Sequence, residues 1–182
     1  MQIKNSRQSI LRGLVLMSIL AAVVAAAFGG LNWLSASLQS VAARQFASID
    51  EARRSIGLAQ VSVPAYFPEG IAWPPSSLIG QKKPFPALAM EFRTIHGSDT
   101  ALIIVQHSGG KTARALQRLS LSTVLEETEY TIKKQPVLLQ VGRCTSGRPC
   151  SQMHWTRAGV QHTVLFMGPA LELIRLSESM IH

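Results

Sequence analysis

The longest run of residues without a charge lies near the start of the chain. Residues 13–34 read GLVLMSILAAVVAAAFGGLNWL and contain no Asp, Glu, Lys or Arg. A helix of about 20 apolar residues, rising 1.5 Å per residue, spans a hydrocarbon core of about 30 Å. The run therefore predicts a transmembrane helix. The apolar side chains expected to anchor it in the lipid bilayer include Leu14, Leu20, Phe28, Leu31, Trp33 and Leu34.

The residues before this run indicate its orientation. Residues 1–12 form a short tail with Lys4, Arg7 and Arg12 and no acidic residue, whereas the residues that follow the run carry both signs of charge. Positive charge favours the cytoplasmic side. We expect a single-pass protein of the plasma membrane with a cytoplasmic N-terminus and an extracytoplasmic C-terminal domain. A cleaved signal peptide is the alternative, because residues 25–27 and 41–43 resemble small-residue cleavage sites.

The residues after the anchor change from helical to irregular patterning. Apolar residues recur at helical spacing over residues 35–58, which predicts a juxtamembrane helix or stalk that Gly57 would end. Four prolines then interrupt residues 61–75. In that segment we expect an irregular chain that packs the aromatic residues Tyr66, Phe67 and Trp73.

The extracytoplasmic domain, residues 59–182, shows mostly a period of two. Two hairpins are predicted, one from strands at 87–94 and 101–107 and the other from strands at 152–156 and 160–167. Further strands are expected at 129–132 and 136–141, and a short helix at 111–119. Pro169 is expected to open a final helix over residues 170–181, whose apolar residues gather on one side.

Composition adds a basic excess but no nucleic-acid signature. The chain has 182 residues, with 18 Lys and Arg against 10 Asp and Glu. This balance fits anionic lipid or an acidic partner. The basic residues are scattered and not interleaved with aromatic ones, so nucleic-acid binding is not predicted. Lys111, Arg114 and Arg118 would share one face of the short helix, either as a solvated face or as a contact for lipid headgroups or a partner.

The two cysteines are the clearest candidates for chemistry. Cys144 and Cys150 are close in sequence, and an exported pair at this spacing predicts a disulfide. The alternative is a soft-metal site made by Cys144, Cys150 and His154, with His162 across the hairpin. Their spacing matches no ligand signature, so no metal or other cofactor is predicted.

Other polar groups do not form a catalytic pattern. Residues 109–112, GGKT, imitate the end of a phosphate-binding loop, but Val105 stands where that motif requires glycine. His96, Ser98 and Asp99 share one turn and are poorly placed to act as a catalytic triad. The acidic residues at 126, 127 and 129 are expected in a solvated loop. With no nucleophile paired to a base, the sequence predicts a protein that is not an enzyme.

Three patches resemble a known bacterial domain. They are VPAYFPEGIAW at 63–73, WTRAGVQHTVLFMG at 155–168 and ALELIRLSESM at 170–180. The chain is similar to an uncharacterised extracytoplasmic domain found C-terminal to single membrane helices in anti-sigma-factor-like and sporulation-type membrane proteins. The matching positions are Pro64, Tyr66, Pro68, Glu69, Gly70, Trp155, Gly159, Ser177, Glu178 and Ser179.

The resemblance implies an α+β fold with a curved antiparallel sheet and a C-terminal helix, and no known activity. The chain departs from the family pattern at Phe67 and His162. The tail before the anchor is too short for the folded sigma-binding domain of the anti-sigma relatives.

These patterns predict a membrane-anchored interaction domain without enzymatic activity, either sensor-like or an accessory subunit of a membrane protein complex. Ala22, Ala26 and Gly30 fall at four-residue spacing. That spacing either lets a second membrane helix approach closely or reflects only the small residues of the span. The alternative function is a metal or redox accessory factor that uses Cys144, Cys150 and His154.

Overall fold

The computed structural model describes residues 17, 43–58, 60–109, 116 and 119–181. The chain divides into two units, Met1–Val41 and Ala42–His182, and the second contains all the elements described below. The predicted anchor, apart from residue 17, lies outside the described residues, as do Lys111, Arg114 and Arg118. Within the described ranges, no helix is long and apolar enough to cross a membrane.

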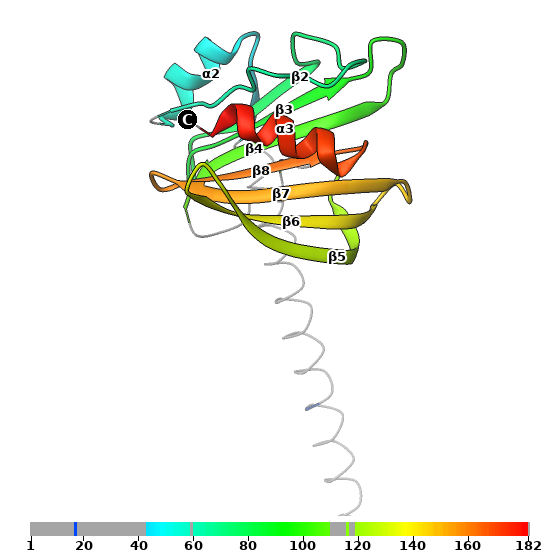
Figure 1. Ribbon diagram of the computed structural model, residues 1–182. Helices are drawn as coiled ribbons and strands as arrows, with labels where there is room; N and C mark the ends of the chain where they lie inside the picture. Colours follow the sequence, from blue (N-terminus) through cyan, green and yellow to red (C-terminus); the bar gives the residue numbers. More distant parts are fainter. Residues whose placement is uncertain (1–16, 18–42, 59, 110–115, 117–118, 182) are drawn as a thin grey trace, which may run out of the picture. The chain divides into compact units, whose positions relative to one another are not determined.

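The domain is an α+β fold built on one antiparallel sheet of eight strands (Figure 1). The strands lie in the order β1-β2-β3-β4-β8-β7-β6-β5. Their bounds are β1 Arg44–Gln45, β2 Ser77–Gln81, β3 Ala87–Arg93, β4 Thr100–Ser108, β5 Leu121–Ile132, β6 Gln135–Cys144, β7 Pro149–Arg157 and β8 Val160–Phe166. Among the described residues, two helices accompany the sheet, α2 Ile49–Ile56 and α3 Ala170–Met180. The predicted C-terminal helix is confirmed.

Both predicted hairpins are present. β3 pairs with β4, and β7 pairs with β8 through a two-residue turn in which Ala158 and Gly159 have φ of 48° and 75°. Positive φ at both central residues gives the turn whose twist matches paired strands. β5 begins earlier than predicted, at Leu121, and residues 122–129 are exposed. Because neither face of this stretch is buried, its sequence lacks the alternation that reveals a strand.

Of the juxtamembrane helix or stalk predicted over residues 35–58, residues 43–48 are not helical, and residues 35–42 lie outside the described part. β1 pairs with β2 instead, and a separate helix begins after Ser48. The Ser48 hydroxyl accepts a hydrogen bond from the Glu51 amide at 3.2 Å, and the Glu51 carboxylate accepts from the Ala47 amide at 3.0 Å. This reciprocal capping starts a new helix. Gly57, with φ of 77°, ends it as predicted.

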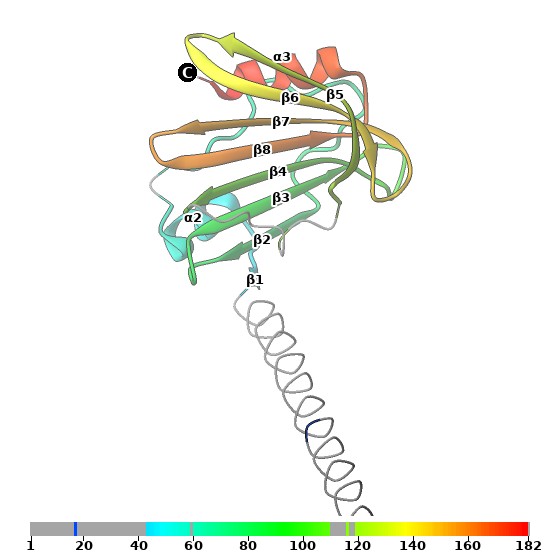
Figure 2. The same ribbon diagram turned by 90° about the horizontal axis from the view of Figure 1, so that it is seen from below.

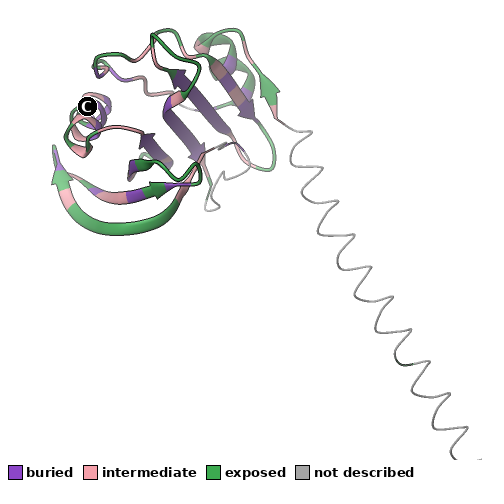
Figure 3. Cartoon of the chain, turned by 90° about the vertical axis from the view of Figure 1, so that its right-hand side faces the viewer, coloured by how far each residue is buried: buried purple, intermediate pink, exposed green. Residues whose placement is uncertain are grey.

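Both helices cover the same face of the sheet. α3 contacts β7 and β8, whereas α2 contacts β2 and β3 (Figure 1). Leu173 and Leu176 of α3 are fully buried in the main core, together with Leu88, Phe92 and Ile104 of the central strands. Figure 3 shows this burial concentrated in the central strands, while β5 is largely exposed.

The proline-rich segment is irregular as predicted, and of its three aromatic residues Phe67 packs against this core, while Tyr66 and Trp73 are more exposed. The Phe67 ring lies 5.4 Å from the Trp73 ring and 5.3 Å from the Phe92 ring, measured between centroids. Gln106 of β4 fixes the start of the segment, because its amide group both accepts from the backbone of Ser62 and donates to it. Tyr66 lies apart from this aromatic group and instead donates to the Glu172 carboxylate of α3.

Two further contacts fix α3. The Ser179 hydroxyl accepts from the backbone amides of Ala65 and Tyr66 at 3.1 and 3.2 Å. The Lys133 ammonium, from the turn between β5 and β6, donates at 3.0 Å to the carbonyls of both Glu178 and Ile181. A cation at a helix C-terminus is favourable because the last carbonyls carry partial negative charge.

The position of α3 predicts a contrast between two leucines. Leu173 is fully buried, whereas Leu171 is 59% exposed on the same helix. Leu173→Ala should lower the free energy of unfolding by about 2–5 kcal/mol because it leaves a cavity in the core. Leu171→Ala is the matched control and should change it by less than about 0.5 kcal/mol. Urea unfolding of both variants checks this, and equal losses would contradict the packing described.

Candidate functional site

A groove of about 490 Å³ lies over the strands β5 to β8. Twelve residues line it, namely Glu129, Tyr130, Thr131, Pro136, Val137, Leu138, His154, Trp155, Thr156, Gln161, His162 and Thr163. Each of the four strands β5, β6, β7 and β8 contributes three consecutive residues. The groove therefore depends on side-by-side strands rather than on one loop.

Strand alternation shows which way the groove faces. Val137 and Trp155 belong to the core under the helices. Successive side chains of a strand point to opposite faces, so Leu138 and His154 point away from the helices. Leu138 pairs with His154, and His154 with Thr163, so these three share that face. The groove thus opens on the face of the sheet opposite α3.

Polar side chains follow one another across this face. Gln140 of β6 donates to the Glu127 carboxylate of β5 at 2.6 Å, and Gln140 is the register partner of Gln152. The Gln152 amide contacts Nε2 of His154, and Nδ1 of His154 lies 2.9 Å from the Thr163 hydroxyl. These side chains come from four strands, and their hydrogen bonds join β5 to β6 and β7 to β8.

His154 is held as a neutral ring. Burial lowers its pKa, and the Glu127 carboxylate opposes that shift only in part. A neutral ring that accepts from Gln152 at Nε2 must carry its proton at Nδ1, where it donates to Thr163; this tautomer is assigned from the network. With both nitrogens engaged, His154 offers no free lone pair to a metal or a substrate.

His162 lies on the other face of the sheet. It pairs with Trp155, and the two rings stack with centroids 4.9 Å apart and an interplanar angle of 2°. Burial lowers the pKa of His162 to about 4, and the positive charges of Arg157 and His107 add to the shift. The register therefore separates His162 from His154, which the metal alternative had placed together.

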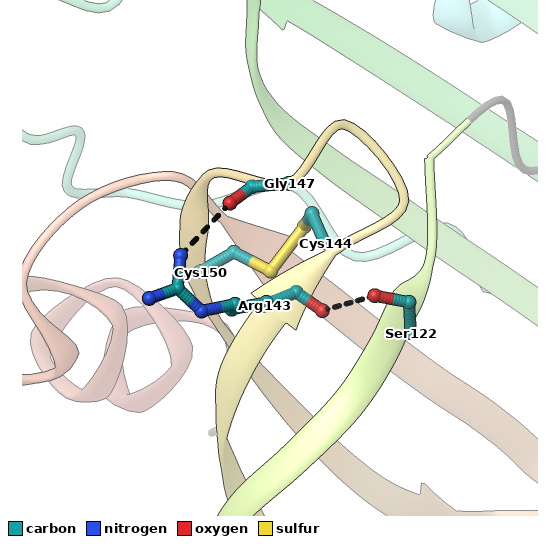
Figure 4. The surroundings of a disulfide bond; sticks show 5 residues. All are labelled: Ser122, Arg143, Cys144, Gly147 and Cys150. Carbon is teal, nitrogen blue, oxygen red and sulfur yellow. Dashed lines mark hydrogen bonds between the residues drawn. A yellow bond between two sulfur atoms is a disulfide. The ribbon is translucent and has the colours of Figure 1, made fainter.

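The predicted disulfide is confirmed. Cys144 and Cys150 are bonded across the turn between β6 and β7, with Cα atoms 5.8 Å apart, and both are buried. Figure 4 shows the turn around the bond. There, the Arg143 carbonyl accepts from the Ser122 hydroxyl at 2.9 Å, and the Arg143 guanidinium donates to the Gly147 carbonyl at 3.2 Å.

The disulfide changes what these sulfurs can bind. Metal ligation by cysteine requires thiolate, and Cys144 and Cys150 hold their sulfurs in a covalent bond. Over the ranges that the structure describes, no group of three or more His, Cys, Asp or Glu residues could hold a metal ion.

The remaining sequence candidates are dispersed. His96, Ser98 and Asp99 lie in an exposed turn, and Asp99 pairs with Arg148 at 3.1 Å. Gly109 follows the end of β4, while residues 110–112 lie outside the described ranges. The acidic residues at 126, 127 and 129 were expected in a loop; they lie instead in the exposed strand β5.

Sequence reasoning missed Gln161 and Thr163 of the groove and Gln140 and Gln152 of the polar series on the same face. The available signal was the alternation of polar residues at 152, 154 and 156 in one strand and at 161 and 163 in the next.

Comparison of the chain with protein-family models, curated proteins and solved structures gives no match.

The disulfide predicts a defined thiol count and a loss of stability. After denaturation without reductant, the protein should take up no thiol label; with reductant it should take up label at both cysteines. The double variant Cys144→Ser/Cys150→Ser should lose about 2 kcal/mol of unfolding free energy, the value for so short a loop in the chain-entropy model. Labelling before reduction would contradict the bond.

The buried histidines predict a pH dependence. The pKa of His162 falls from 6.5 to about 4 on folding, so the unfolded chain binds a proton that the folded chain excludes between these values. Stability should therefore be complete above about pH 6.5 and decline as the pH falls towards 4. The lowered pKa values of His154 and His107 act in the same direction.

His162→Phe keeps a ring beside Trp155 and removes the titrating group, so its urea midpoint should fall less than that of the wild type between pH 7 and pH 4.5. His96→Phe, in the exposed turn, is the control for loss of a histidine. An unchanged decline in His162→Phe would show that another group controls the effect.

Proposed function

We propose that this chain is a single-pass membrane protein whose extracytoplasmic domain binds a protein partner and performs no catalysis. In this proposal, residues 13–34 hold the chain in the plasma membrane lipid with the N-terminus in the cytoplasm. The domain then acts as an accessory subunit of a membrane complex or as a sensor-like module. The observation that supports binding most strongly is the groove on the face of the sheet opposite α3.

The groove has the properties of a recognition surface. Its volume of about 490 Å³ falls within the usual range of about 300–1,000 Å³ for binding pockets. Leu138 and Pro136 supply apolar surface, while Thr156 and Glu129 offer exposed polar groups at its border. His154 is occupied by its neighbours, so this polar centre supports orientation of a ligand rather than proton transfer.

The proposal predicts a partner in native membranes. After solubilisation in mild detergent and separation on a native gel, the full chain should migrate with a stoichiometric partner. Co-migration with a large complex favours the accessory subunit, and a small complex favours the sensor-like module. Migration of the wild-type chain alone would contradict the proposal.

Two threonines provide a matched test of the groove. Thr156→Trp places a large side chain in the groove, and the variant should migrate without the partner. Thr145→Trp makes the same change in the exposed turn between β6 and β7, at the other end of β7. That control should retain the partner. Loss of the partner in both variants would indicate a general effect on the fold.

A further inference from the structure

We infer that the open edge of β5 takes up an extended segment of the partner that carries Lys or Arg at alternate positions. The added strand would extend the sheet and lie beside the groove. This inference rests on the proposed function and names the chemistry of the partner. Three features of β5 support it: an open edge, outward-facing backbone groups and a uniform negative charge.

The outer edge of β5 is open within the described part of the chain. β5 is the last strand of the sheet and pairs only with β6 among the strands described. Figure 2 shows β5 beside β6 at one edge of the sheet. Residues 122–129 of β5 are exposed (Figure 3). Bulges interrupt its pairing between Leu121 and Thr123 and between Val124 and Glu126. From Glu126 to Ile132 the register is regular, so this stretch offers a regular edge for another strand.

The hairpin turn fixes which backbone groups face outward. β5 and β6 are joined by Lys133 and Lys134, with φ of 47° and 70°, and Ile132 pairs with Gln135. In a two-residue hairpin the flanking pair exchanges both hydrogen bonds, and bonded and non-bonded pairs then alternate. Ile132, Tyr130 and Thr128 therefore bond to β6. Thr131, Glu129 and Glu127 direct their N–H and C=O groups to the open edge.

Charge indicates the kind of strand that fits. β5 reads LSTVLEETEYTI, with three glutamates and no Lys or Arg. The register partners of Glu127 and Glu129 are Gln140 and Leu138, so both carboxylates lie on the groove face. Opposite charges in cross-strand pairs are favourable, and like charges are unfavourable. A basic strand is complementary, whereas antiparallel pairing with a second β5 would bring glutamates close to each other.

The probe is a short peptide of alternating Lys and Val, added to the full chain in mild detergent. We expect it to bind, and we expect a peptide of alternating Glu and Val not to bind. Binding should slow hydrogen exchange at the amides of Glu127, Glu129 and Thr131, because these donors would enter a new ladder. Binding without protection of these amides would contradict strand addition.

Two variants separate charge from backbone pairing. Glu127→Lys/Glu129→Lys should weaken binding of the Lys-Val peptide by about tenfold or more, because attraction becomes repulsion. Glu69→Lys/Glu178→Lys makes the same change in charge at exposed sites elsewhere and should bind as the wild type does.

Thr131→Pro keeps all three glutamates of β5 and removes one backbone N–H donor from its open edge. Proline is tolerated at such an edge position, so this variant should fold and bind the peptide weakly.

Wild-type affinity in Thr131→Pro would show electrostatic attraction alone and overturn the inference. A concentration-dependent dimer of the chain that Thr131→Pro dissociates would show that a second copy occupies the edge, which also overturns it. The native-gel experiment stands apart from these results. If Glu127→Lys/Glu129→Lys still migrates with the native partner, the partner docks elsewhere; the edge inference then fails while the proposed function stands.

Discussion

The packing of α3 against β7 and β8 is the constraint on which the rest of the domain depends. Leu173 and Leu176 supply its buried apolar side. Contacts from distant parts of the chain then fix its ends, since Lys133 donates to carbonyls at its C-terminus, and Tyr66 contacts Glu172 near its start. The helix thereby ties the proline-rich segment and the β5–β6 turn to the centre of the sheet.

This packing makes the two faces of the sheet unequal. The helices and the segment around Phe67 cover one face, while the other face of β5 to β8 carries the groove and the polar series from Glu127 to Thr163. The core residues of β7 and β8 alternate with the groove residues along the same strands. A second buried cluster, which includes Cys150 and Leu165, lies on the same face as the groove, so both faces contribute to stability.

The sequence predicts the elements whose burial leaves a periodic trace. The strands β3, β4 and β8 bury nearly every residue, so each leaves a short apolar run in the sequence. β7 and α3 bury mainly one side, so their periods are visible. β5 buries little of either side between residues 122 and 129, and its strand pattern is hidden. The break before α2 was readable, because Ser48 and Glu51 form a capping pair, but the helical spacing of apolar residues suggested continuity. The pairing of β4 with β8 joins strands separated by three others in sequence, and local patterns do not reveal it.

The same limit applies to the groove. Two cysteines with short spacing identify the disulfide directly, whereas the groove needs polar residues from four strands placed in register. The central claim is that a partner binds on this side of the domain. The most direct test is a photoreactive amino acid placed at Thr156 in the groove and, as a control, at the exposed Leu171 of α3, followed by irradiation of native membranes. The proposal predicts a cross-linked partner from position 156 and none from position 171; cross-linking from position 171 alone would contradict it.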